Sequence, residues 1–266
     1  GFSHSANTTG LILKNYTGRA AKICYRPDER GRMVTDRSTS AINLHVPANI
    51  KPVAGDATIF LDYLAYMFPN ERELHEVKKW CATLISCPEV RMGYGLLLVS
   101  EAQGIGKTTL GSMILGKLVG DHNVGYPSEH TITSSDFTDW IAHKRLVVVN
   151  EIYSGHSWKA YNSLKTFITD KDITVNAKYQ KPYILDNWAH IIAMSNSMRA
   201  LRMEQDDRRW FYPEVTEVRW PREKFIELYN WISSGGLSIV KHWADNFGDY
   251  VDASDRAPMT GRKKEM

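Results

Sequence analysis

The stretch from Leu96 to Leu110 constrains the fold most, because it joins a buried strand, a glycine loop and the start of a helix. Residues 96–99 are consecutive aliphatics, a pattern typical of a strand buried on both faces. Gly104 and Gly106 follow, and a helix-compatible apolar run begins at position 110. This order predicts a P-loop, in which backbone N–H groups surround phosphate oxygens at a helix N-terminus.

Inside this loop, Lys107 is expected to reach the outer phosphates of ATP, and the Thr108 hydroxyl is expected to bind Mg²⁺. The residues expected to contact the nucleotide are Gln103, Gly104, Ile105, Gly106, Lys107, Thr108 and Thr109. Glu101 departs from the common pattern, which has a glycine at that position. We expect an altered first turn and retained phosphate binding. The alternative is a plain strand-to-helix turn.

Composition excludes several classes of protein. The chain has 266 residues, 43% of them hydrophobic and 24% charged, which suits one globular domain with a small appendage. A net charge of +3 means that nucleic acid would need a local basic groove. The three cysteines, Cys24, Cys81 and Cys87, lack zinc spacing and predict buried free thiols in a reducing cytoplasm. No apolar run reaches membrane length, so we expect no membrane partner.

A second aliphatic strand, residues 146–149, ends in Asn150 and Glu151. We expect it to lie beside the P-loop strand and to bring both side chains to the metal and the attacking water. Glu151 would polarise that water, and Asn150, Glu151 and Thr108 would form the Mg²⁺ site. An amide at position 150 holds a metal-bound water but adds no charge. The alternative is a strand that simply ends at a polar loop.

A third strand, residues 189–194, ends in Ser195 and Asn196. Asn196 is placed to hydrogen-bond the γ-phosphate or the catalytic water. Further along, Arg208 and Arg209 follow Asp207. This arginine pair has two interpretations: a surface patch of salt bridges, or an arginine finger that reaches the γ-phosphate of a neighbouring subunit.

Residues 173–185 predict a hairpin whose tip carries Lys178, Tyr179 and Lys181. Amines beside an aromatic ring suit single-stranded DNA, with the amines on phosphates and the ring on a base or sugar. A solvated turn is the alternative interpretation.

The remaining segments give a provisional domain organisation. A helix is expected from about Phe137 to His143, with its N-cap among residues 133–136. Because the first residue is glycine, we expect the chain to be part of a longer protein. The expected units are a partly irregular connector with short strands at 1–55, a helical hairpin acting as a lid or collar at 56–92, the core at 93–215, C-terminal helices at 216–246 and a mobile tail at 247–266.

Taken together, residues 56–215 resemble the superfamily 3 helicases of viruses, phages and plasmids, in particular the helicase-like domain of primase-helicases. Five segments match that family's motifs A and B, its B-prime pore hairpin, its motif C and its arginine finger, in that order: 104–108, 147–151, 176–179, 195–196 and 207–209. The departures are Glu101, Asn150 and Tyr179.

The resemblance implies an α/β P-loop NTPase of the AAA+ type, with a mostly parallel sheet flanked by helices and preceded by a helical collar. It implies a ring, expected to be a hexamer, that binds ATP and Mg²⁺ between subunits and grips single-stranded DNA. Its catalytic residues would be Lys107, Glu151, Asn196 and Arg208, with Arg209 as a second candidate finger. The resemblance also implies a primase or polymerase domain elsewhere in the full-length protein. It implies that the protein works in the cytoplasm of the host cell. Two alternatives remain: an ATPase that remodels or packages nucleoprotein, and a nucleotide-gated assembly module.

Overall fold

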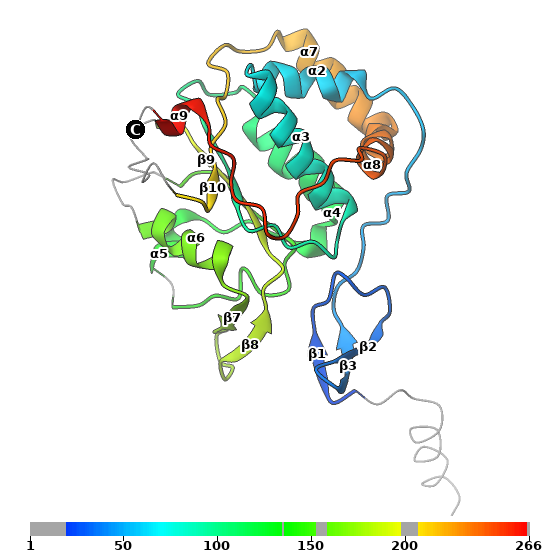
Figure 1. Cartoon of the computed structure of the whole chain (residues 1–266), viewed down its shortest axis with the longest axis vertical. Coiled ribbons are helices and arrows are strands. Elements are labelled where there is room, and N and C mark those ends of the chain that lie inside the picture. The colour runs from blue at the N-terminus through cyan, green and yellow to red at the C-terminus, as the bar shows by residue number, and fades with distance from the viewer. Residues whose placement is uncertain (1–19, 135, 153–158, 198–206, 265–266) are drawn as a thin grey trace, which may run out of the picture.

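A computed structural model describes residues 20–134, 136–152, 159–197 and 207–264. Its centre is a five-stranded parallel sheet with the strand order β10-β4-β9-β6-β5. The strands are β4 (Gly95–Val99), β5 (Val124–Gly125), β6 (Leu146–Val149), β9 (His190–Ser195) and β10 (Trp210–Phe211). Helices cover both faces (Figure 1), so the predicted α/β fold is confirmed.

Side chains alternate between two hydrophobic cores along each central strand, because successive residues of a strand point to opposite faces. In β4, Leu96 and Leu98 enter one core, and Leu97 and Val99 enter the other. The same alternation holds in β6 and β9. This explains why these strands appear in the sequence as unbroken aliphatic runs.

In the described ranges, helices from the early, middle and late parts of the chain cover the first face, and α5 (Glu129–Ser134) and α6 (Lys159–Thr169) cover the second (Figure 1). On the first face lie α2 (Thr58–Met67), α3 (Glu71–Ser86), the π-helical η1 (Thr109–Leu115) with α4 (Gly116–Val119), and α7 (Arg222–Trp231), η4 (Ile232–Gly236) and α8 (Leu237–Asp245). A short 3₁₀ turn, η2 (Asp121–Asn123), precedes β5.

Two small sheets lie next to each other below the central sheet (Figure 1). One contains β1 (Lys22–Cys24), β2 (Met33–Asp36) and β3 (Thr39–Asn43); the other is the hairpin of β7 (Asp172–Val175) and β8 (Tyr183–Asp186). Asp172 and Asp186 face each other across that hairpin. Arg37 of the first sheet forms ion pairs with both carboxylates and so offsets their repulsion.

Two expectations about the core are wrong. The helix expected over 137–143 is absent from the structure: α5 ends earlier, and residues 139–143 form turns. The backbone there bonds to the hairpin instead, since Thr138 N donates to Asn176 O and the Asn176 amide donates to Asp136 O. The strand that carries Glu151 is also not beside the P-loop strand, because β9 lies between β4 and β6.

The end of the chain differs from the mobile tail expected at 247–266. Residues 247–264 cross the molecule from α8 to a short helix, α9 (Gly261–Lys264), as Figure 1 shows. Val251 and Lys263 are buried, and Ala257 N donates to Arg208 O beside the edge strand β10. A lysine-rich ending resembles a solvated tail, but Lys263 Nζ donates to the backbone carbonyl of Asp207 inside the fold.

All three cysteines are free and buried, as the sequence predicts. Within the described ranges, no helix combines the length and apolar character needed to cross a lipid bilayer.

Candidate nucleotide-binding site

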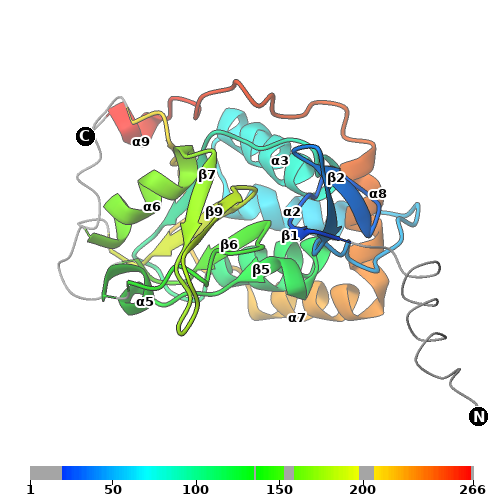
Figure 2. The ribbon, with the colours of Figure 1, turned by 90° about the horizontal axis from the view of Figure 1, so that it is seen from below.

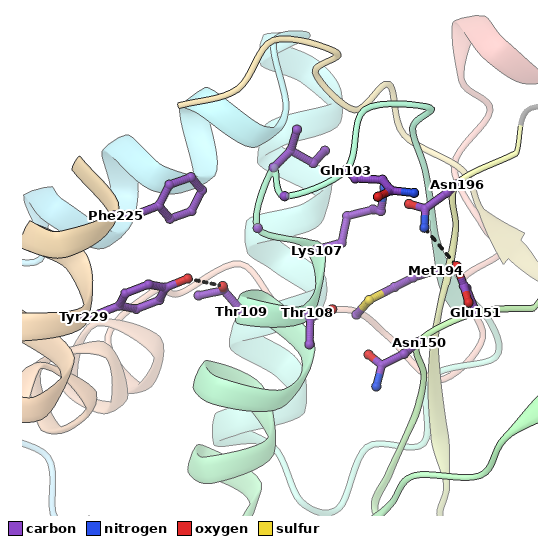
Figure 3. A pocket seen from close by; sticks show the side chains of 13 residues that line it. Gln103, Lys107, Thr108, Thr109, Asn150, Glu151, Met194, Asn196, Phe225 and Tyr229 are labelled. Carbon is purple, nitrogen blue, oxygen red and sulfur yellow. Dashed lines mark hydrogen bonds between the residues drawn. The ribbon is translucent and has the colours of Figure 1, made fainter. Parts of the chain in front are cut away.

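A cavity of about 340 Å³ opens where the carboxyl ends of β4, β6 and β9 meet. It brings together every loop residue expected to contact nucleotide with three polar residues from the ends of the neighbouring strands (Figure 3). Its lining residues are Gln103, Gly104, Ile105, Gly106, Lys107, Thr108, Thr109, Asn150, Glu151, Met194, Asn196, Phe225 and Tyr229.

The loop has the backbone shape that its glycines permit. Gly104 and Gly106 have φ angles of 73° and 107°, values that a side chain makes costly. A Cβ on Gly106 would lie 3.0 Å from the ring of Tyr63, whose hydroxyl donates to Gly106 O at 2.7 Å. Helix α2 therefore fixes the loop from behind, and side-chain growth at Gly106 is blocked.

Lys107 is only 8% exposed and lies against the loop it belongs to. Its Nζ donates to Ser100 O at 3.0 Å and to Ala102 O at 3.4 Å. Burial lowers the pKa of Lys107, while Glu217 and Glu151 act in the opposite direction. The loop thus holds a desolvated cation beside the cavity, where an anionic ligand would be attracted strongly.

The first turn of the loop is held by a carboxylate that is distant in the sequence. Glu217 accepts hydrogen bonds from Glu101 N at 3.3 Å and from Ala102 N at 2.8 Å. Arg219 Nε donates to Gln103 O at 3.0 Å. Glu217 thus satisfies two backbone N–H groups of the turn in which Glu101 stands in place of the usual glycine.

Polar side chains line the β6 and β9 side of the cavity. Asn196 Nδ2 donates to Glu151 Oε1 at 3.0 Å, which fixes the direction of the carboxylate. Thr108 and Asn150 lie on the same side (Figure 3). Hydroxyl, amide and carboxylate oxygens are the donors that Mg²⁺ prefers, together with water. Among the described residues, no cluster of three or more His, Cys, Asp or Glu side chains suits a metal.

Two aromatic residues of α7 close the opposite wall, and the sequence analysis missed them. Phe225 and Tyr229 stack with their ring centroids 6.0 Å apart, and the Tyr229 hydroxyl lies 3.0 Å from Thr109 Oγ1. Their four-residue spacing is visible in the sequence, but it also fits an ordinary amphipathic helix. Only their position across the loop distinguishes them (Figure 3).

The candidate DNA-binding residues lie away from this cavity. Lys178, Tyr179 and Lys181 occupy the exposed turn between β7 and β8. Tyr179 is 92% exposed with a φ of 64°, and Lys178 Nζ lies 5.0 Å from the centre of its ring. Figure 2 shows this hairpin extending from the body of the molecule.

The two candidate finger arginines are also outside the cavity. Gly95 N donates to Arg209 O at 2.8 Å, so the arginine turn, residues 207–209, lies at the start of β4, whereas the P-loop follows the end of that strand. Arg208 is exposed. Asp207 anchors the turn, accepting from Tyr161 at 2.9 Å and Lys165 at 3.0 Å. Neither arginine lines the P-loop cavity of its own chain in this structure.

The parallel sheet and the glycine loop define a P-loop-like NTPase fold, and the comparisons with known proteins agree. A family of unknown function, DUF5906, matches residues 98–209. The DNA primase-polymerase of Nitratiruptor phage NrS-1 is 26% identical over 201 residues, a stretch that covers 71% of this chain and 27% of that protein.

Solved structures give the same result for the fold. Two apo structures of the NrS-1 C-terminal region match 100% of this chain and 66% of theirs, with TM-scores of 0.75 and 0.76 at 23% and 21% identity. The chain therefore spans 27% of the length of the phage primase-polymerase. It spans 66% of the solved C-terminal region of that protein.

Proposed function

We propose that this chain is an ATP-dependent helicase or translocase domain of a viral or plasmid replication protein. The observation that carries the proposal is the single cavity that joins the P-loop, with Lys107, to the hydrogen-bonded pair of Glu151 and Asn196. Nucleotide hydrolysis needs a cation that binds the phosphates and, beside it, an oriented carboxylate that can activate the attacking water. Similarity to a phage DNA primase-polymerase supports a role in replication.

The residues divide the chemistry between them. Lys107 and the loop N–H groups bind the phosphates, and Phe225 with Tyr229 forms a wall for the base. Glu151 accepts the proton of the attacking water as the γ-phosphorus–oxygen bond to ADP breaks, and Asn196 keeps that carboxylate aimed. Thr108, Asn150 and Glu151 would hold Mg²⁺, which when bound supplies positive charge beside the phosphates.

We place the chain in a ring, a hexamer by resemblance, in which Arg208 or Arg209 of one subunit completes the site of the next. Lys178, Tyr179 and Lys181 would hold single-stranded DNA at the hairpin tip. A primase or polymerase domain of the full-length protein would lie outside this chain, and the protein would work in the host cytoplasm. Each of these assignments extends the resemblance to superfamily 3 helicases.

Phosphate release, measured with and without single-stranded DNA, tests the proposal. Lys107→Ala should lose ATP binding, because it removes the buried cation of the loop. Glu151→Gln should bind ATP with normal affinity and lose hydrolysis. If Glu151→Gln hydrolyses ATP at the wild-type rate, Glu151 does not activate the water.

One observation favours a second candidate, a nucleotide-gated assembly module. Asn150 offers an amide at a position where a carboxylate would hold the metal more strongly. A module of this kind would bind ATP and assemble without releasing phosphate, so the wild type and Glu151→Gln would behave alike. An ATPase that remodels or packages nucleoprotein would hydrolyse ATP without unwinding a DNA duplex.

A further inference from the structure

The segment Thr260–Lys264, here called the strap, contacts both the strand that leads into the P-loop and the arginine turn. Its first contact is Arg262, whose guanidinium donates to Val99 O at 2.8 Å and to Val215 O at 3.1 Å. Val99 ends β4, directly before the loop. The same guanidinium lies 3.8 Å from the Glu217 carboxylate, which holds the first turn of the loop.

Its second contact is Lys263, a lysine that is 1% exposed. Lys263 Nζ donates to Asp207 O at 2.9 Å, and burial lowers the pKa of Lys263. Asp207 also accepts from Arg209 N at 2.9 Å, so the backbone on both sides of Arg208 is fixed. Burying an ammonium group costs free energy unless the group is well hydrogen-bonded. Here the hydrogen-bond acceptor is the Asp207 carbonyl in the arginine turn.

The strap itself is anchored to the first face of the sheet. Thr260 is buried, and Gly261 N donates to Glu73 Oε1 at 3.1 Å. The other oxygen of this α3 carboxylate accepts from Glu214 N at 2.5 Å. The strap is thus fixed to α3 as well as to β4 and the arginine turn, so its two cationic side chains are held in defined positions.

We propose that the strap positions the P-loop through Arg262 and the arginine turn through Lys263, and so connects the two interfaces that one subunit makes in a ring. The inference rests on the proposed function, since the arginine turn matters only if it serves a neighbour's site. Arg262 and Lys263 are positioning residues: neither lines the nucleotide cavity. ATP bound on one side of a subunit would thereby influence the finger presented on the other side.

The two residues should therefore affect different quantities. Arg262→Ala should weaken binding of a fluorescent ATP analogue on the order of tenfold, the value of a hydrogen bond to a charged group. Lys263→Met keeps the side-chain length and removes the ammonium; it should leave that affinity unchanged and lower kcat roughly tenfold or more. Lys263→Arg restores a cation and should recover part of kcat. Arg256→Ala, an exposed arginine before the strap, is the matched control.

Mixing each variant with Lys107→Ala separates the two ends of the strap. Lys107→Ala supplies an intact arginine turn beside a defective P-loop, so it should rescue Lys263→Met, whose own P-loop is sound. It should not rescue Arg262→Ala. In that mixture the only subunits that keep Lys107 are the Arg262→Ala subunits, and their own P-loops are the defective part. Melting temperatures of all variants show whether folding is retained.

Three outcomes would overturn the inference while the wild type remains active: equal effects of both variants on affinity, rescue of both by mixing, or losses that follow the melting temperature alone. A wild-type chain that neither binds nor hydrolyses ATP would instead overturn the proposed function.

Discussion

At the scale of single residues, Phe225 and Tyr229 are the new components of the site. They lie across the loop from Glu151, and their rings offer a flat apolar wall of the kind that nucleotide bases stack on. Phe225→Ala should raise the KM for ATP roughly tenfold with a much smaller change in kcat, since the wall acts on binding. Steady-state hydrolysis kinetics would measure both. Ile226→Ala, on the exposed side of the same helix, is the control, and equal effects of the two changes would remove Phe225 from the site.

A site residue could be predicted from the sequence when it lies in the P-loop or directly at the end of a predicted strand. The loop residues, Asn150, Glu151 and Asn196 end strands or follow them, and parallel strands bring their carboxyl ends together. Glu217 is more than a hundred residues from the N–H groups it satisfies, as the separation of 115 from Ala102 shows, and no local pattern marks it. Phe225 has a periodicity, but the same periodicity describes ordinary core packing.

At the scale of elements, the β7–β8 hairpin is separable from the nucleotide site. Its tip lysines do not line the nucleotide cavity, so Lys178→Ala combined with Lys181→Ala should leave basal hydrolysis intact. Binding to single-stranded DNA should weaken, and the slope of log affinity against log salt should fall by about 0.7 for each lysine. Fluorescence anisotropy over a salt series would measure this. Lys171→Ala, at the base of the hairpin, is the control; an unchanged slope in the double variant would move the DNA site elsewhere.

The elements themselves were predictable where the aliphatic pattern was strong, as in the three central strands β4, β6 and β9, but not in the two-residue strands β5 and β10. The helix expected at 137–143 failed because residues near Asp136 and Thr138 bond to Asn176, a partner that no local pattern shows. The position of β9 between β4 and β6 was not predicted, since strand order depends on crossovers rather than on any one segment.

At the scale of the whole molecule, ring assembly has a direct test. Arg208→Ala should bind ATP through its own loop and lose most turnover, because an arginine finger is worth on the order of a thousandfold or more in rate. Mixed with Lys107→Ala, it should regain part of that turnover at interfaces that pair a sound loop with a sound Arg208. A mixture that assembles but stays inactive would mean that Arg208 acts within its own chain or only supports structure, and Arg209→Ala would then be tested in the same way.

Stability of the whole fold should depend on pH through two histidines near the buried Arg145. Burial, aided by Arg145, lowers the pKa of His45 to about 4 and that of His190 well below its usual 6.5. The unfolded chain therefore takes up protons that the folded chain does not, and the free energy of unfolding should fall as pH decreases from 6.5 toward 4. Each histidine contributes at most about 1.4 kcal/mol per pH unit. Denaturant titrations at several pH values should show that the free energy of unfolding of His45→Phe, which keeps an aromatic ring without a titratable nitrogen, changes less steeply with pH than that of the wild type. Between pH 7.5 and 8.5 the histidines should contribute no change.

The contact between Arg262 and Val99 joins residues 163 positions apart, and it has a consequence for synthesis. The P-loop and Glu217 both emerge from the ribosome before the strap does, so Val99 and Glu217 lack their contact with Arg262 until the strap has been made. The nucleotide site would therefore be completed late, after the sheet and its helices have formed. A nascent chain that stalls before position 260 should therefore carry a folded core that binds ATP more weakly than the finished chain, much as Arg262→Ala does.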